Sequence, residues 1–441
     1  MADVPFLGMR ASDDFITNAR PENWREMLLY LYPNGAASLT AMTAMMKTES
    51  TDDPHYHWFT KQLPTLKAAC TGVFTTSAMN VAYATGASAG TTLYFRMSAT
   101  DVDKIRLGHQ VMMRCSVDPS LDVVGKVTAR AKNGASSYVA VYLHEADDNS
   151  IQARTLSACD VVKIIGNINP EGGTIPSSIR YDPVEYYNYT QIFRTSLAMT
   201  RTAKRTRLRT GNQVEQARKE ALELHGIEME NAFIFGKRTL STGDNGHPER
   251  TTGGIREFIT TNRFNYPADG GGAWLTDGWD YLMEKLRSVF RFGDSRERIG
   301  YCGNGVLLAV AQLAKEYGTF ELTAMKTVFG IEIFEWITPF GRLFLKDHPL
   351  FNHDDTLNYS MLVVQPSNLI YRYIDDTKYY PNRQANDLDG EQSEYLSEAG
   401  LELHHEETFA WFDGLGLNTW GTLTTAAPTT LAPTTTAPTT V

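Results

Sequence analysis

Residues 186–236 limit the possible folds of this chain more than any other segment does, because a cationic stretch there leads directly into a long predicted helix. No Asp or Glu occurs between Tyr186 and Val214. The six cations of this interval are Arg194, Arg201, Lys204, Arg205, Arg207 and Arg209. A Thr- and Arg-rich arm that leads into a long helix is not suited to form a catalytic pocket. It suits a chain that lays part of itself on a neighbour.

The helix is predicted over 212–236, with a marked start and an apolar side. Asn212 is a favoured N-cap, and Glu215 follows three positions later, as in a capping box. Glu215 and Lys219 have the spacing of a favourable i, i+4 pair, while Leu224 and Phe233 belong to two adjacent rows at helical spacing. About 23 residues would span about 35 Å, which is enough to brace a whole subunit.

Length and charge limit the class of protein. A chain of 441 residues exceeds one ordinary core, so we expect two or three domains. The net charge of −10 argues against a general DNA-binding protein and leaves the basic segment as a local exception. Four scattered cysteines indicate a reducing compartment. We expect no signal peptide and no membrane span, and we place assembly in a cytoplasm.

A β-rich module is predicted at 101–166. Turn signals such as Lys132-Asn133-Gly134 separate four apolar runs, which favours a small sheet or barrel inserted in the chain. The runs are 111–117, 122–131, 137–145 and 158–168.

The remaining segments predict mixed α and β structure. Residues 20–48 suggest two short helices broken by Pro33-Asn34-Gly35. Further on, we expect a helix over 276–293 with Asp277 as its N-cap, a second over 304–318, and a β-hairpin over 327–349. The Thr/Pro repeats at the C-terminus carry no charge and cannot form a core.

No catalytic, metal or cofactor site is predicted. His55 and His57 have no third ligand at zinc-like spacing, so we interpret them as packing residues. His404 and His405 are expected on opposite faces of a strand, where they could not chelate one ion. The nucleotide-loop, serine-hydrolase and HExxH motifs do not occur. We therefore expect a protein that is not an enzyme.

The basic segment allows three interpretations. Its cations could neutralise a phosphate backbone, could pair with carboxylates of a neighbouring subunit, or could form an ordinary solvated surface. We favour the pairing with a neighbour, because the acidic chain supplies many carboxylates.

An ordered set of segments resembles the major capsid proteins of tailed bacteriophages, with the Hong Kong 97-type fold. The segments are LLYLYPNGAASLTAMTAMMK with PHYHWF (28–59), YNYTQIFRTS (187–196), RKEALELHGIEMENAFIFG (218–236), TTGGIREFI (251–259), the FRFG to YCGNGV region (290–306) and EYLSEAGLELHHEETFAWFDGL (394–415).

The resemblance implies an α+β capsid subunit with an inserted small β domain. Its parts would be an N-terminal arm (1–55), the start of an extended loop (56–100), the β module (101–166), the return of the extended loop (167–211), a spine helix (212–236), peripheral and axial domains (237–420) and the Thr/Pro tail (421–441). In this family the extended loop lies over the adjacent subunit, which is the role expected for the six cations.

The implied function is that of a head subunit that self-assembles, as hexamers and pentamers, into an icosahedral shell around double-stranded DNA. It would be a component of the virion that binds no specific DNA sequence. Scaffolding, portal and decoration proteins are the other expected partners. Two alternatives stay open: a nucleic-acid-binding module that uses residues 194–209, and a cellular compartment shell protein of the same fold.

Overall fold

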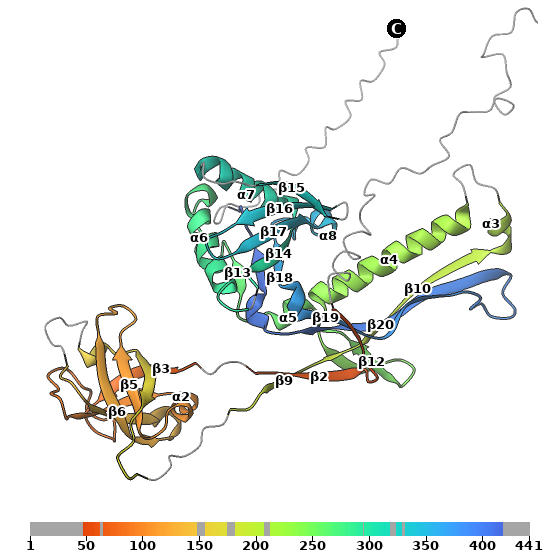
Figure 1. Ribbon diagram of the computed structural model, residues 1–441. Helices are drawn as coiled ribbons and strands as arrows, with labels where there is room; N and C mark the ends of the chain where they lie inside the picture. The colour runs from red at the N-terminus through yellow and green to blue at the C-terminus, as the bar shows by residue number, and fades with distance from the viewer. Residues whose placement is uncertain are drawn as a thin grey trace, which may run out of the picture. The chain divides into compact units, whose positions relative to one another are not determined.

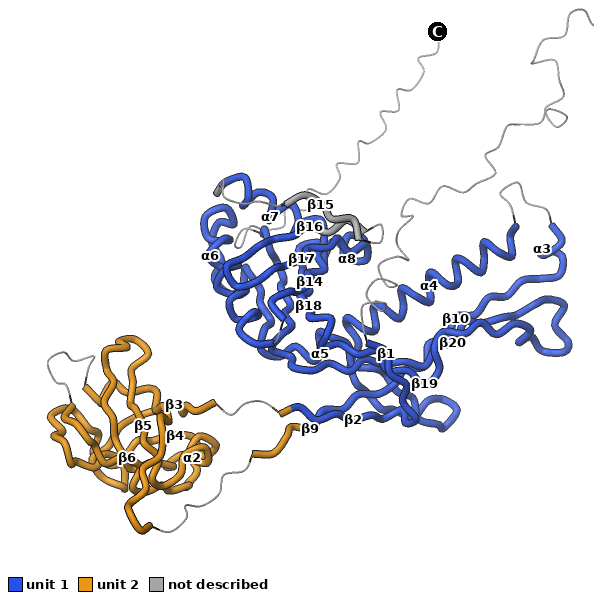
Figure 2. The backbone as a smooth tube through the Cα atoms, viewed as in Figure 1, with its two compact units in different colours: residues 1–60, 185–441 blue, residues 61–184 orange. Residues whose placement is uncertain are grey.

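The computed structural model describes residues 47–61, 65–147, 155–173, 181–206, 212–293, 295–317, 323–328 and 331–417. Most of the predicted arm, the cations Arg207 and Arg209, and the predicted tail lie outside these residues. The chain divides into two compact units (Figure 2), of which the first combines Met1–Thr60 with Glu185–Val441 and the second is Lys61–Val184. Among the described helices, none has the length and apolar character needed to cross a lipid bilayer.

The second unit is built around a closed barrel of antiparallel strands in the order β3-β4-β7-β6-β5-β8. Alternate side chains of each strand point inward, so that Leu93, Phe95 and Met97 of β4 are all buried. The strands are β3 (Lys67–Phe74), β4 (Thr92–Met97), β5 (His109–Arg114), β6 (Asp122–Ala131), β7 (Tyr138–Leu143) and β8 (Val161–Asn167); α2 (Ala99–Lys104) follows β4.

The barrel begins before the expected start of the β module. Its first two strands, β3 and β4, precede residue 101 and come from the segment expected to open the extended loop. Several runs of this segment are short and mixed in polarity, and β3 has a register shift between Cys70 and Gly72. Strict alternation is therefore weak in the sequence there. Closure of the barrel, which removes both sheet edges, needs these two strands.

The first unit contains a large mixed sheet with the order β13-β21-β18-β14-β17-β16-β15. Helices α6 (Trp274–Val289) and α7 (Asn304–Tyr317) pack on it (Figure 1), and Trp274, Leu282 and Val306 are buried in the shared core. The strands are β13 (Arg263–Asn265), β14 (Glu297–Cys302), β15 (Thr323–Val328), β16 (Ile331–Ile337), β17 (Arg342–Asp347), β18 (Met361–Val364) and β21 (Ala410–Asp413).

Two sequence expectations for this region can be compared directly with the structure. The hairpin over 327–349 is present as β16 and β17, whose turn is closed by the Thr338 amide donating to the Gly341 carbonyl at 2.9 Å. The helix expected from Asp277 starts earlier, at Trp274 after the cap residue Ala273. The buried Trp274 extends the apolar face toward the N-terminus, and Asp277 lies in the first turn instead.

A second, four-stranded sheet has the order β1-β19-β20-β10. The long helix α4 (Gln213–Phe235) runs beside β10 and β20, and the short helix α3 (Arg201–Arg205) continues from the end of β10 (Figure 1). The strands are β1 (Lys47–Ser50), β19 (Leu369–Tyr380), β20 (Gly390–Leu403) and β10 (Gln191–Thr200).

Two strand pairs and two short helices complete the first unit. Strand β2 (His55–Thr60) pairs with β9 (Val184–Tyr189), and β11 (Thr239–Thr242) pairs with β12 (Pro248–Thr251). Helix α5 (Ile255–Phe258) follows β12, and α8 (Pro349–His353) follows β17. The chain enters the barrel after β2 and returns through β9, so the second unit is an insertion between two paired strands.

We expect Phe95→Ala to destabilise the barrel by about 3–5 kcal/mol, because it leaves a cavity at a fully buried site. Tyr94→Ala is the matched control, since Tyr94 lies on the outer face of the same strand and is only partly buried. The loss of stability is measured for both variants by denaturant unfolding, with hydrogen exchange of the barrel-strand amides as the probe. Equal losses for the two would contradict the inward and outward alternation of β4.

Candidate functional site

The basic segment begins on β10 with Arg194 and continues beyond the end of that strand. Strand β10 pairs with β20 in antiparallel register. Arg194 Nε lies 2.9 Å from Glu394 Oε2, in a charge-assisted contact with a carboxylate that is almost fully buried. The Arg194 side chain itself remains 61% exposed, so it is accessible to solvent.

The next cations lie at the end of this ribbon, on or beside α3. Thr200 Oγ1 caps α3 by accepting the Ala203 amide at 3.2 Å. Arg201 Nε lies 2.9 Å from Asp389 Oδ1. The Lys204 ammonium pairs with Glu391 and, as the main cause, lowers the pKa of that carboxyl. Both cations remain more than half exposed.

Three of the six predicted cations therefore contact carboxylates of their own chain, whereas the sequence interpretation assigned those carboxylates to a neighbour. Arg205 is exposed on α3, and Arg207 and Arg209 lie outside the described residues. The sequence separation of the two strands, about 200 residues between Arg194 and Glu394, hides this pairing from pattern reading. The Arg201–Asp389 pair is exposed and contributes little stability, so Arg201 can exchange partners at small cost, whereas the buried Glu394 carboxylate holds Arg194 more firmly.

The two ends of α4 are defined by local hydrogen bonds. Asn212 Oδ1 accepts the Val214 amide at 3.1 Å, and the Gly236 amide donates to the Ala232 carbonyl at 2.8 Å. Glu215 and Lys219 are both exposed, and no ion pair between them is seen in the part of the chain that the structure describes. The predicted cap is present at the start of the helix, and the predicted pair is not.

The buried side of α4 mixes apolar and polar residues. Leu222 and Leu224 are 46% and 55% exposed, although both belong to rows that the sequence predicts as apolar. Phe233 is buried as its row predicts. The full buried set is Ala221, His225, Met229, Glu230, Phe233 and Ile234. A search of the sequence for an apolar stripe misses the buried face of α4, because His225 and Glu230 on that face bind polar partners.

His225 joins α4 to three strands through a chain of hydrogen bonds. Its Nδ1 lies 3.0 Å from Thr195 Oγ1 of β10, and its Nε2 lies 2.7 Å from Ser397 Oγ of β20. Ser397 donates in turn to Thr377 Oγ1 of β19, at 2.8 Å. Burial lowers the pKa of His225, and the nearby Glu228 only partly offsets this effect. The neutral ring is therefore the form that fits here.

Glu230 joins α4 to the large sheet. Its Oε1 lies 2.5 Å from Nε2 of His348, and both side chains are almost completely excluded from solvent. Lys346 of β17 is also buried; burial lowers its pKa, while Glu230 and Asp347 act in the opposite direction. Its ammonium lies 5.5 Å from the centroid of the Tyr301 ring. Glu230 therefore serves two buried groups, as the hydrogen-bond partner of His348 and, together with Asp347, as a carboxylate that favours the charged form of Lys346.

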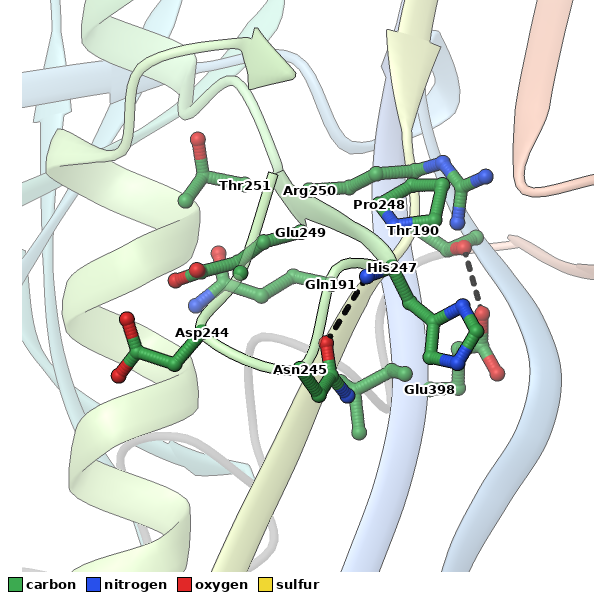
Figure 3. A pocket seen from close by; sticks show the side chains of 12 residues that line it. Thr190, Gln191, Asp244, Asn245, His247, Pro248, Glu249, Arg250, Thr251 and Glu398 are labelled. Carbon is green, nitrogen blue, oxygen red and sulfur yellow. Dashed lines mark hydrogen bonds between the residues drawn. The ribbon is translucent and has the colours of Figure 1, made fainter. Parts of the chain in front are cut away.

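An open polar groove lies between the β11–β12 hairpin and the strands β10 and β20 (Figure 3). Its volume is about 460 Å³. Asp244, Glu249, Arg250 and His247 come from the hairpin side, and Glu398 comes from β20, where it accepts a hydrogen bond from Thr190 Oγ1 at 3.0 Å. Within the described ranges no three potential ligands are close enough together to hold a metal ion.

The histidine pairs considered as metal ligands have other partners. His55 contacts the rings of Tyr187 and Tyr189, with centroids 5.3 and 4.7 Å away, and His57 Nδ1 lies 2.7 Å from Glu185. Strand β20 ends at Leu403, so His404 and His405 follow the strand instead of alternating within it, and His405 has a left-handed backbone with φ of 54°.

Comparison with known proteins decides the family. The family described as SU10 major capsid protein matches residues 11–416, which is most of the chain. The chain belongs to this capsid protein family. It is therefore a structural subunit of a phage capsid and not an enzyme. A curated relative, the major capsid protein of Pseudomonas phage PaMx41, is 25% identical over 332 residues, covering 74% of this chain and 72% of the relative.

Several solved structures are also similar to this capsid protein. A chain of Mycobacterium phage Bobi matches with 8% identity and a TM-score of 0.46, over 90% of this chain and 96% of that one. A chain from the capsid of Myoviridae phage XM1 matches with 11% identity and a TM-score of 0.34, over 57% and 81%. A chain of the SrpI encapsulin complex from Synechococcus elongatus PCC 7942 has 11% identity and a TM-score of 0.36, over 53% and 75%.

We expect acidification to loosen α4 through His225. Because burial lowers its folded pKa, the unfolded chain takes up the proton first as the pH falls below about 6.5. The stability that depends on the neutral ring is complete above that pH and is lost as the pH falls toward the folded pKa. Hydrogen exchange of α4 amides, corrected for intrinsic rates, should be faster at about pH 5.5 than at about pH 7.5.

The variant His225→Gln should reduce this pH difference, since an amide hydrogen-bonds without titrating in that range. His247→Gln, which changes an exposed histidine, is the control and should retain it. A full pH difference in the His225→Gln chain would assign the effect to another group.

We expect Glu230→Ala to lower the free energy of unfolding by about 1–3 kcal/mol, the cost of leaving the buried His348 ring without its hydrogen-bond partner. Glu223→Ala is the matched control, because Glu223 is exposed on the same helix. Chemical denaturation monitored by tryptophan fluorescence measures both variants. A loss below about 1 kcal/mol at Glu230, the level of an exposed pair, would show that the remaining buried groups rearrange when the carboxylate is removed.

Proposed function

We propose that this capsid protein assembles with copies of itself, as hexamers and pentamers, into an icosahedral shell that encloses phage double-stranded DNA. Its subunit architecture would be the Hong Kong 97-type. The observation that carries this proposal is the attachment of α4. The helix is held to one sheet through His225 and to the other through Glu230, so it acts as a strut between them.

A strut of this kind suits a shell subunit. A shell requires each copy to present its contact surfaces at fixed angles over many repeats. The buried contacts of His225 and Glu230 fix the rotation of α4 about its axis, since a turn of the helix would leave both side chains without partners. The exposed side, with Leu222 and Leu224, is then presented in one orientation.

The extended loop of the proposed subunit, with its start within 56–100 and its return within 167–211, would run through the pair β2 and β9. Residues 61–184 lie between them, so the loop would carry the barrel as its insertion. The outgoing strand of the loop, which the sequence alone does not identify, would then be β2. The other proposed parts keep their ranges: arm 1–55, spine helix 212–236, peripheral and axial domains 237–420, and tail 421–441.

The cations of the basic segment would contribute to contacts between subunits. Arg194, Arg201 and Lys204 pair with carboxylates of their own chain yet remain more than half exposed. A second subunit can therefore contact the same ion pairs and extend them into a network. Their internal partners also make these three cations weaker ligands for phosphate, which disfavours the reading as a nucleic-acid-binding module.

The proposed partners are other copies of the chain, scaffolding and portal proteins and, on the finished shell, decoration proteins. Assembly would take place in the host cytoplasm. The DNA would be enclosed without recognition of its sequence, as expected for a chain of net charge −10.

The test is a variant with Arg201, Arg205, Arg207 and Arg209 all changed to Ala. We expect a folded subunit whose yield of particles falls about tenfold or more, because a loss of about 1.4 kcal/mol per contact already changes an association constant tenfold. Electron microscopy and sedimentation of the chain co-expressed with its scaffold measure the yield.

The matched control replaces four exposed cations elsewhere, Lys67, Lys163, Lys237 and Arg287, and lowers the net charge by the same amount. Circular dichroism establishes that both variants are folded. Normal assembly of the first variant together with lost, salt-dependent DNA affinity would favour the nucleic-acid reading. Shells that hold a cargo enzyme in place of DNA would identify a cellular compartment.

A further inference from the structure

Three of the four cysteines lie in the inserted barrel, and all four are buried and reduced. Cys70 is on β3, Cys115 directly follows β5, and Cys159 lies just before β8. Cys302 belongs to the large sheet of the other unit. Nothing in the proposed shell function uses these thiols, so the arrangement of the barrel cysteines calls for its own explanation.

Two of these cysteines lie on neighbouring segments of the barrel. Strands β3 and β8 are antiparallel, with Ala69 opposite Val161. The next pair in this register continues beyond β8, where the Cys70 amide donates to the Asp160 carbonyl at 2.7 Å. Cys159 directly precedes Asp160, so its backbone lies beside that of Cys70 across this seam. Both side chains are buried in the barrel core, and an S–H···S interaction between them acts on the pKa of each thiol.

We propose that Cys70 and Cys159 form a redox-active pair that closes into a disulfide across the seam between β3 and β8. These strands are the first and the last of the barrel and adjoin each other in the closed sheet. A bond there would connect the two ends of the barrel covalently, within a single chain, and would enclose the other four strands in one covalent loop.

The local surroundings indicate which of the two thiols reacts first. Cys70 is 8% exposed and Cys159 is 4% exposed, so Cys70 is the more accessible sulfur. The hydrogen bond from Cys159 is the main influence that lowers the pKa of Cys70, and the Arg96 guanidinium contributes. Arg96 is fixed beside it, since its Nη2 donates to the Thr71 carbonyl at 3.3 Å. A thiolate stabilised in this way is the attacking species in thiol–disulfide exchange.

The reaction balances with a small-molecule disulfide as the oxidant. The Cys70 thiolate attacks one sulfur of that disulfide, which breaks its S–S bond, forms a mixed disulfide at Cys70 and releases one small thiolate. The Cys159 thiol then loses its proton and attacks the Cys70 sulfur, which releases the second small thiolate. The protein loses two protons and two electrons, and the oxidant is reduced to two thiols.

The biological setting rests on the proposed function. A shell assembled in a reducing cytoplasm and then released outside the cell passes from a compartment that keeps thiols reduced to one where disulfides persist. The barrel would therefore fold without the bond and acquire it after release. The chemistry itself can be measured on the unassembled chain, so a failure of the shell proposal leaves this one testable.

The experiment treats the purified, reduced full chain with oxidised glutathione and then counts free thiols in denaturant. We expect the count to fall from the four present to two, with a loss of two hydrogens in intact mass and a peptide map that links Cys70 to Cys159. Dithiothreitol should reverse the change. Proteolysis within the barrel should slow about tenfold or more after oxidation.

Single variants test the assignment. Cys115→Ser and Cys302→Ser should form the same bond as the unaltered chain. Cys159→Ser should stop at the mixed disulfide, with glutathione retained on Cys70. Four thiols that stay free, or a bond that joins Cys115 to either partner, would overturn the proposal. If a variant fails to fold, the thiol count and the peptide map of the unaltered chain still decide it.

Discussion

The contact between Glu230 and His348 is the interaction on which much of the first unit depends. It joins the long helix α4 to the large mixed sheet at a site where almost no solvent reaches either group. Lys346 is buried close by, and the same carboxylate favours its charged form. A buried pair of this kind adds less stability than apolar packing would. What it adds is selectivity, because only one position of α4 satisfies all of these groups.

The other attachment of α4 follows the same principle. His225 is fixed by Thr195 and Ser397, so the helix is held on the four-stranded sheet by directional bonds as well as by Phe233 and its apolar neighbours. Apolar surfaces can slide past each other with little change in energy, whereas hydrogen bonds lose their geometry within about 1 Å. A helix with a polar buried face keeps its register under load, and capsid subunits experience load from packed nucleic acid in the proposed shell.

Local signals in the sequence predicted much of the secondary structure. Asn212 marks the start of α4, the turn at Thr338 to Gly341 marks the β16–β17 hairpin, and alternation marks most of the barrel. The errors arose where distant residues decide the structure. Leu224 is exposed because His225 and Glu230 take the buried side, and their partners Ser397 and His348 lie more than 110 residues away. The partners of Arg194, Arg201 and Lys204 were missed for the same reason. Strands β3 and β4 belong to the barrel because the sheet needs them to close, and no local sequence pattern predicts this closure.

The insertion of the barrel between β2 and β9 also bears on how such a protein can change over time. The two strands pair with each other, so the first unit keeps an intact sheet edge whatever the intervening chain contains. Mutations in the barrel are confined to a core of their own, separate from the residues that hold α4. The barrel can therefore diverge in sequence, be exchanged for another domain or carry a grafted peptide while the strands that receive it keep their pairing. The barrel can therefore vary in one chain while the first unit around it keeps its structure.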